Sequence, residues 1–190
     1  SRGLGDVYKR QQLDMLNRYN SGELWHPDSI HLDKSQAFHT LRNNRTVYGG
    51  GGIMPDLFVP ADTSRFSPYY RDLVAKGSIM KYALGYIEKN RAELLARYPD
   101  EEKFANSFIP DEEMVKGLIA QGEKDSVPFN EEQWQRSRDM ILAILRGLMT
   151  RDLYENGIYV RATNPLSNDF NEAYRLINDP ECYYRLLKGK

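Results

Sequence analysis

Histidine and aspartate side chains gather in one polar stretch of the chain, where they could in principle bind a metal ion. Imidazole and carboxylate groups are ligands that zinc and other transition metals accept in proteins. The residues concerned are His26, Asp28, His31 and Asp33, with His39 further on. The first four lie in a segment where no regular helix or strand is predicted, so nothing fixes the spacing that a metal site needs, and a solvated polar loop is favoured. We therefore expect no metal and no cofactor.

Nucleophilic side chains are present but lack the neighbours that would activate them. The only cysteine, Cys182, lies in a short predicted helix, and beyond the N-terminus of that helix nothing nearby in sequence would stabilise a thiolate. A half-buried structural cysteine is therefore favoured. One cysteine also excludes an internal disulfide and a zinc site with several cysteines. The chain has no Gly-x-Ser-x-Gly sequence, the turn that presents the serine of many hydrolases.

A run of four glycines, Gly49–Gly52, is the most unusual local feature of the sequence. A phosphate-binding loop would need backbone N–H groups at the start of a helix, usually followed by Lys and Ser or Thr. Here Pro55, Asp56 and the strand-like segment Leu57–Val59 follow instead. Because glycine permits positive φ and a close approach of other groups to the backbone, the run predicts a tightly turning, bulged connection between strands.

Before residue 67 the sequence is typical of loops and short strands. Strands are predicted at Ala37–Leu41 and Arg45–Tyr48, with Asn43-Asn44 in the positive-φ positions of a tight hairpin turn. A third strand is predicted at Leu57–Val59. It should end at Pro60, because proline has no N–H to donate to a neighbouring strand.

After residue 66 the sequence carries the signals of helices. Ser67-Pro68 places an N-cap before a proline at the first helical position, and Asn130 with Gln133 resembles a capping box. The predicted helices cover residues 13–19, residues 67–97 with a loosening at Gly77 or Gly85, Asp111 to about Gly122, Asn130 to before Gly157, a segment from Asn168 or Asp169, and Asp179 to Gly189. One apolar face of the longest is formed by Trp134, Ile141, Leu145 and Leu148. The whole predicts an α+β fold, with short β-strands followed by a predominantly α-helical domain.

Charge and hydropathy exclude several classes of protein. The 190 residues include 26 Lys or Arg and 27 Asp or Glu, a net charge of −1. Neither half of the chain is strongly charged, which argues against a nucleic-acid-binding or polybasic membrane surface. No apolar run approaches the roughly 18 residues that cross a bilayer, so no membrane-spanning segment is expected. The 41% of hydrophobic residues is enough for a sizeable core in one domain, with or without an appendage.

The segment Arg45–Pro60, RTVYGGGGIMPDLFVP, resembles the C-terminal end of the catalytic core in the carboxyl-terminal processing (tail-specific) serine peptidases. In that family a glycine-rich segment leads to Gly-Ile-x-Pro-Asp and an apolar strand. The flanking segments Leu13–Asn20 and Asp62–Phe66 resemble the Bacteroidetes branch, which carries a helical C-terminal extension. The resemblance covers residues 12–190. Its sharp motif consists of Gly49, Gly50, Gly51, Gly52, Pro55 and Asp56.

The resemblance implies a parent endopeptidase in which a Ser nucleophile and a Lys general base lie upstream of the glycine-rich hairpin, usually behind a PDZ domain. Here the upstream candidates lack the required setting and spacing; they are Ser21, Ser29, Ser35 and Lys34. Two downstream pairs, Ser64 with Lys89 and Ser78 with Lys103, have suitable separations but lie around predicted helices, and we interpret them as coincidences. No catalytic residue is therefore assigned in this chain.

Three segments are predicted. Residues 1–11 resemble translated sequencing-adapter sequence and are interpreted as a non-native leader, residues 12–66 as the C-terminal edge of the serine peptidase core, and residues 67–190 as the helical extension. We expect a structural fragment of a serine endopeptidase, inactive alone, whose parent is periplasmic or in the cell envelope and cleaves protein or peptide substrates. The alternative is a non-catalytic helical module that self-associates or docks a regulatory or adaptor protein.

Overall fold

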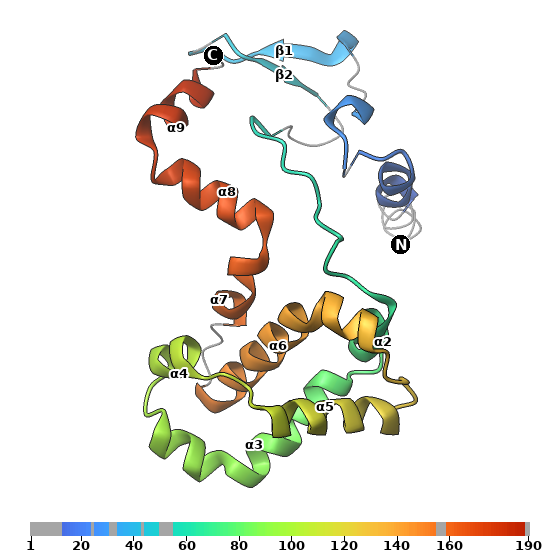
Figure 1. Cartoon of the computed structure of the whole chain (residues 1–190). Coiled ribbons are helices and arrows are strands. Elements are labelled where there is room, and N and C mark those ends of the chain that lie inside the picture. The colour runs from blue at the N-terminus through green and yellow to red at the C-terminus, as the bar shows by residue number, and fades with distance from the viewer. Residues whose placement is uncertain are drawn as a thin grey trace, which may run out of the picture. The chain divides into compact units, whose positions relative to one another are not determined.

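The computed structural model describes residues 13–23, 25–30, 34–42, 44–49, 55–154 and 159–188 (Figure 1). Helices make up 69% of these residues and the strands form a small two-stranded antiparallel sheet, which confirms the α+β class. Contacts between residues divide the chain into two compact units. We call Asp62–Ser167 the helical unit, and Ser1–Ala61 together with Asn168–Lys190 the hairpin unit.

The helical unit is built around α6 (Glu131–Tyr154), the longest helix in the described part of the chain (Figure 1). Its other elements are α2 (Pro68–Ala75), α3 (Ser78–Arg97), α4 (Glu101–Ser107), α5 (Glu112–Lys124), α7 (Tyr159–Thr163) and the 3-10 turn η3 (Asn164–Leu166). The helices α2, α3, α4 and α7 pack against α6, whereas α5 packs mainly against α3. The long helix is therefore the scaffold on which the shorter ones are placed.

Side-chain caps fix the starts of three helices where the sequence predicts them. Ser67, Asp111 and Asn130 each accept a hydrogen bond from the backbone N–H three residues further on. The capping box at Asn130 is only half formed. Gln133 Oε1 accepts instead from the backbone N–H of Tyr69, at 2.7 Å, so that this side chain links the start of α6 to α2.

Two helical features differ from the sequence-based prediction. The loosening expected at Gly77 or Gly85 is a complete break at Gly77, which takes the left-handed conformation (φ 68°) between α2 and α3, while Gly85 stays inside α3. The helix α4 was not predicted. Asp100 is its N-cap, and its seven residues bury only Phe104, so its apolar period is too short to be recognised.

The core of the helical unit runs along α6. The predicted apolar face is confirmed, since Trp134, Ile141 and Leu145 are buried and the half-buried Leu148 packs against the same cluster. Burying an aliphatic side chain of this size stabilises the fold by about 1.5–3 kcal/mol. At the C-terminal end of α6, Tyr154 Oη donates a 2.5 Å hydrogen bond to the Tyr98 carbonyl. The helix is thus anchored by apolar contacts along its length and by a polar contact at its end.

A buried hydroxyl on α6 fixes the segment that enters the helical unit. Ser137 Oγ donates to the Arg65 carbonyl at 2.6 Å and accepts from the backbone N–H of Ser67 at 3.0 Å. The hydroxyl of Ser67 lies 2.8 Å from the same oxygen. Since buried polar groups need such partners, the serine at this position holds the N-cap of α2 against α6.

The hairpin unit contains the sheet and the last two helices. Its described elements are a helix over residues 13–20, the 3-10 turns η1 (Pro27–Ser29) and η2 (Lys34–Gln36), the strands β1 (Ala37–His39) and β2 (Thr46–Tyr48), and the helices α8 (Asn168–Ile177) and α9 (Pro180–Leu187). The strands pair antiparallel with Phe38 opposite Val47. None of these elements has a fully buried residue among those described. The helices predicted at residue 13, at residue 168 and after Asp179 are confirmed.

Two predictions about strands need correction. The strands are shorter than predicted, since β1 ends at His39 rather than Leu41 and β2 begins at Thr46 rather than Arg45, although the backbone N–H of Thr40 still pairs with the Arg45 carbonyl (2.9 Å). Asn44 has the predicted positive φ (49°), whereas Asn43 lies outside the described residues. The strand predicted at Leu57–Val59 is wrong. The segment has no partner strand in the described part of the chain, and a strand cannot form without one.

Two glycines test how closely the helices pack. A Cβ at Gly147 on α6 would lie 2.8 Å from the Tyr159 ring and 3.1 Å from the Tyr159 carbonyl oxygen, whereas a Cβ at Gly85 would meet nothing within 4 Å. We expect Gly147→Ala to lower the free energy of unfolding by about 1–3 kcal/mol. Gly85→Ala should raise it by about 0.4–1 kcal/mol, because alanine restricts the unfolded chain. Urea denaturation followed by circular dichroism measures both; equal stability of the two variants would contradict this packing.

Candidate functional site

The glycine-rich motif continues from the second strand of the hairpin. The backbone N–H of Gly49 donates to the Gln36 carbonyl at 2.8 Å, which extends the pairing of β1 and β2 by one step. A Cβ at Gly49 would lie 2.9 Å from Phe38 Cε2, so the Phe38 ring lies close to the backbone at this position, while the predicted bulge in the glycine run stays a prediction. Arg45 and Asp56 form an ion pair that joins the two flanks of the run. Gly50, Gly51 and Gly52 lie outside the described residues.

Neither of the two Ser–Lys pairs with suitable spacing is brought together. The backbone N–H of Ser64 donates to Asp62 Oδ1 at 2.9 Å, while Lys89 lines a cleft beside α3. Ser78 begins α3, and Lys103 lies in α4. No hydrogen bond joins the serine to the lysine of either pair, although all four residues belong to the described part of the chain. The interpretation of both pairs as coincidences agrees with these positions.

Ser78 belongs instead to a hydrogen-bonded cluster around Asp125, at the end of α5. The carboxylate accepts from Ser78 Oγ at 2.7 Å, from Lys81 Nζ at 2.7 Å and from Gln121 Nε2 at 3.1 Å. These hydrogen bonds, first that from Lys81, lower the pKa of Asp125 to about 2. Ser78 is fully buried, and the lysine is bound to the carboxylate rather than to the serine. The cluster therefore links α3 to α5 and has no arrangement for nucleophilic attack.

Cys182 is half-buried, as predicted, and its backbone N–H donates to the helix cap Asp179 at 3.0 Å. Its surroundings are more cationic than the sequence suggested. The pKa of Arg185 is raised chiefly by a hydrogen bond to Cys182, and that of Arg175 is raised by Glu172 first and by Cys182 second. Arg185 follows the cysteine by three residues on the same helix, whereas Arg175 precedes it by seven residues on the preceding helix. The fold of the two helices therefore brings both arginines to the cysteine.

The polar stretch considered for a metal contains His26, Asp28 and His39 among the described residues, while His31 and Asp33 lie outside them. No three His, Cys, Asp or Glu side chains of the described residues gather where they could hold a metal ion. His26 precedes the turn η1, and His39 ends β1 with its side chain exposed. The described residues therefore contain no candidate metal centre.

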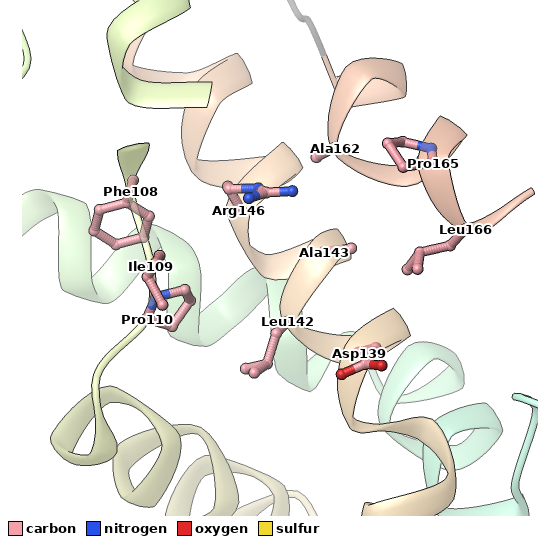
Figure 2. A pocket seen from close by; sticks show the side chains of 10 residues that line it. All are labelled: Phe108, Ile109, Pro110, Asp139, Leu142, Ala143, Arg146, Ala162, Pro165 and Leu166. Carbon is pink, nitrogen blue, oxygen red and sulfur yellow. The ribbon is translucent and has the colours of Figure 1, made fainter. Parts of the chain in front are cut away.

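One cleft of the helical unit lies along one side of α6, and we call it the α6 cleft (Figure 2). Its volume is about 210 Å³. It is lined by Phe108, Ile109, Pro110, Asp139, Leu142, Ala143, Arg146, Ala162, Pro165 and Leu166. The walls are the loop between α4 and α5, the face of α6, and α7 with η3. Eight of the ten lining residues are apolar, and the two charged ones, Asp139 and Arg146, both come from α6.

Arg146 is the unusual residue of this cleft. Its Nε is buried and has no hydrogen-bond partner, and its guanidinium forms no ion pair with any described residue. In Figure 2 the side chain extends from α6 toward the side of the cleft formed by α7. A buried donor without a partner is costly in a folded protein, and native proteins seldom keep one without a ligand or water to satisfy it. Arg146 was not identified from the sequence. There it lies beside the apolar stripe of a predicted helix, where an arginine is normally exposed to solvent, and nothing in its neighbours shows that its Nε is buried.

Two further clefts in the helical unit are less specific. One of about 250 Å³ is lined entirely by apolar or tyrosine side chains and Gly77, with Ile144 and Leu148 contributed by α6. The other, of about 600 Å³, lies between α3 and α5 and contains Tyr82 and Tyr86, which pack against the core as predicted. Burial is the main cause that raises the pKa of Tyr82 to about 12. These phenols stay neutral and serve packing rather than acid–base chemistry at ordinary pH.

The comparisons with known proteins bear on the helical unit alone. Residues 69–155 match the model of a family described as "Family of unknown function (DUF8443)". The match runs from α2 to just past the end of α6, and it includes both charged residues of the α6 cleft. No curated protein matches the chain, and no solved structure does. Within the described residues, no helix has the length and the apolar character that crossing a membrane requires.

The cluster around Asp125 gives a pH-dependent prediction. A carboxyl whose pKa is about 2 in the folded protein and 3.8 in the unfolded chain stabilises the fold above pH 3.8, and that stabilisation is lost as the pH falls toward 2. We therefore expect Asp125→Asn to be less stable than the wild type at pH 6, and the difference to shrink between pH 4 and pH 2. Denaturation midpoints measured across this range test the effect. Asp139→Asn is the control, since Asp139 forms no hydrogen bond with a described residue; a constant difference for Asp125→Asn would contradict the cluster.

Proposed function

We propose that this chain is the C-terminal part of a carboxyl-terminal processing serine endopeptidase. Residues 12–66 would belong to the edge of the peptidase core, and residues 67–190 would form a helical extension. In the parent, an upstream Ser Oγ would attack the scissile carbonyl carbon, its proton would pass to a neutral Lys Nζ, and backbone N–H groups would stabilise the oxyanion. The present chain would support that site without supplying a reacting group. The parent would be exported to the periplasm or cell envelope.

The observation that carries this proposal is the exposed hairpin next to the glycine-rich motif. The strands are three residues long, and Phe38 and Val47 remain 60% and 43% exposed. A two-stranded hairpin is at best marginally stable by itself, and its free edges are the positions where further strands add to a sheet. Because Arg45 and Asp56 of the motif also hold together in this unit, the segment has the character of the border of a larger sheet.

The proposal predicts that the chain alone hydrolyses no peptide bond. The chemistry needs a serine hydrogen-bonded to a lysine, whereas Ser64 and Ser78 of the two pairs with suitable spacing bond to Asp62 and Asp125. Casein and fluorogenic peptides with free carboxyl ends serve as substrates for the purified chain. Mixing it with a separately expressed upstream portion of the parent should produce turnover. Hydrolysis by the chain alone that disappears in Ser78→Ala or Ser64→Ala would show that one of the dismissed pairs is the dyad.

The second candidate, a self-associating helical module, is favoured by the exposed apolar residues of α8 and α9. Tyr174 and Ile177 on α8 are 63% and 72% exposed, and Tyr184 on α9 is 60% exposed. Residues four and three positions apart lie on the same side of a helix, so Phe170, Tyr174 and Ile177 form a stripe. Apolar stripes of this kind commonly mark surfaces that bind another protein.

Sedimentation velocity of the whole chain tests this candidate. If the stripe mediates self-association, the wild type should sediment as a discrete oligomer and Ile177→Glu as a monomer. Leu84→Glu is the matched control, because Leu84 is a half-exposed apolar residue on α3, in the other unit. It should keep the oligomer. If the wild type sediments as a monomer at micromolar concentrations, self-association is excluded, and the proposal that the chain is a structural part of a peptidase remains.

A further inference from the structure

We propose that the α6 cleft binds a short apolar peptide with free termini, whose carboxylate contacts Arg146 and whose ammonium group contacts Asp139. The site lies wholly within the helical unit, so it does not rest on the proposed peptidase function. It would be a binding site, since none of its side chains is arranged as a nucleophile or a metal ligand.

The cationic end of the site is Arg146. Its Nε is buried without a partner, and no acidic side chain of the described residues neutralises its guanidinium. A planar guanidinium offers donors in the geometry that a carboxylate accepts, and such charge-assisted hydrogen bonds are stronger than neutral ones. The ligand group that best satisfies this residue is therefore a carboxylate.

The anionic end of the site is Asp139, seven residues earlier on α6 and on the same cleft wall (Figure 2). It forms no ion pair or hydrogen bond with a described residue. Seven residues of α-helix correspond to about 10 Å along the axis. An extended chain covers roughly 3.3–3.6 Å per residue, so a tripeptide spans about 10 Å and a dipeptide about 7 Å, and the long, flexible side chain of Arg146 can reach the carboxylate of the shorter ligand. A simple fatty acid would leave the aspartate without a partner.

The lining between Asp139 and Arg146 determines which chemical groups the ligand can carry between its two charged ends. Leu142 and Ala143 form the floor on α6, the loop Phe108–Pro110 forms one side, and α7 with η3 forms the other. Ile109 is 79% exposed at the rim, where a ligand would cover it. The cleft volume of about 210 Å³ is below the roughly 300–1,000 Å³ of sites for larger ligands. Small apolar side chains between two free termini match both the lining and the size.

Isothermal titration of the whole chain with the dipeptide Leu-Leu tests the proposal. Leu-Leu should bind, while Leu-Leu-amide, which lacks the carboxylate, and N-acetyl-Leu-Leu, which lacks the ammonium group, should each bind at least about tenfold more weakly. The substitution Arg146→Gln should weaken the binding of Leu-Leu to a similar extent. Leu-Leu-amide should bind to this variant as weakly as it binds to the wild type. Asp139→Asn should weaken Leu-Leu and leave N-acetyl-Leu-Leu unchanged.

Two controls separate loss of binding from loss of fold. Arg138→Gln changes an exposed arginine of α6 that does not line the cleft, and it should bind Leu-Leu as the wild type does. Arg146→Gln should not lower Tm, because the guanidinium makes no hydrogen bond that the fold would lose. The proposal fails if Leu-Leu does not bind, if it binds equally well to Arg146→Gln, or if the acetylated and free dipeptides bind alike.

Discussion

The apolar side of α6 has to be removed from water, and most of the helical unit takes its position from that requirement. Trp134, Ile141 and Leu145 lie on this side, and α2, α3, α4 and α7 each cover part of it. Isolated helices of five to eight residues are unstable in water, because the first turn is costly to form. The helices α2, α4 and α7 are of this length, so they depend on contact with α6 and its neighbours for their stability. The caps and the break at Gly77 then determine where each of them begins and ends.

The α6 cleft results from the way in which the shorter helices pack against α6. Along α6 the buried Leu145 faces the core, while Gly147, two residues further on, lets Tyr159 approach to a distance that no side chain would permit. Arg146 lies between these two contacts, at the border where neither the core nor α7 provides it with a partner. The small side chains of Ala143 and Ala162 leave the space beside it open. The unpaired guanidinium and the cleft thus have the same cause. The residues on either side of Arg146 pack closely against the core and against α7, while Arg146 itself, as an ion, cannot be buried in either contact.

The sequence predicts those features that rest on neighbouring residues. The caps at Ser67, Asp111 and Asn130, the apolar face of α6 and the positive φ of Asn44 all follow from local chemistry and are confirmed. The prediction fails where the outcome depends on distant partners. The segment 57–59 has the composition of a strand but no described strand beside it, and α4 is held by aromatic contacts that a seven-residue pattern does not reveal. The α6 cleft joins residues from three separate segments, so no spacing in the sequence could indicate it. The predicted boundary between residues 12–66 and 67–190 stays a prediction, and so does the relation of these segments to a peptidase.

The two units differ in the physical basis of their stability, and this difference bears on what each contributes. The helical unit has a continuous core, with polar links such as Ser137 that are satisfied internally, and it is the part that matches a family model. The hairpin unit has no fully buried side chain in its described elements, and its apolar residues, among them Phe38 and Ile177, face outward. These exposed apolar residues are the surface that further strands of the proposed peptidase core, or another copy of the chain, would cover. In the helical unit, by contrast, the elements that line the α6 cleft are held by α6 itself, because α4 and α7 pack against α6 and η3 packs against α7.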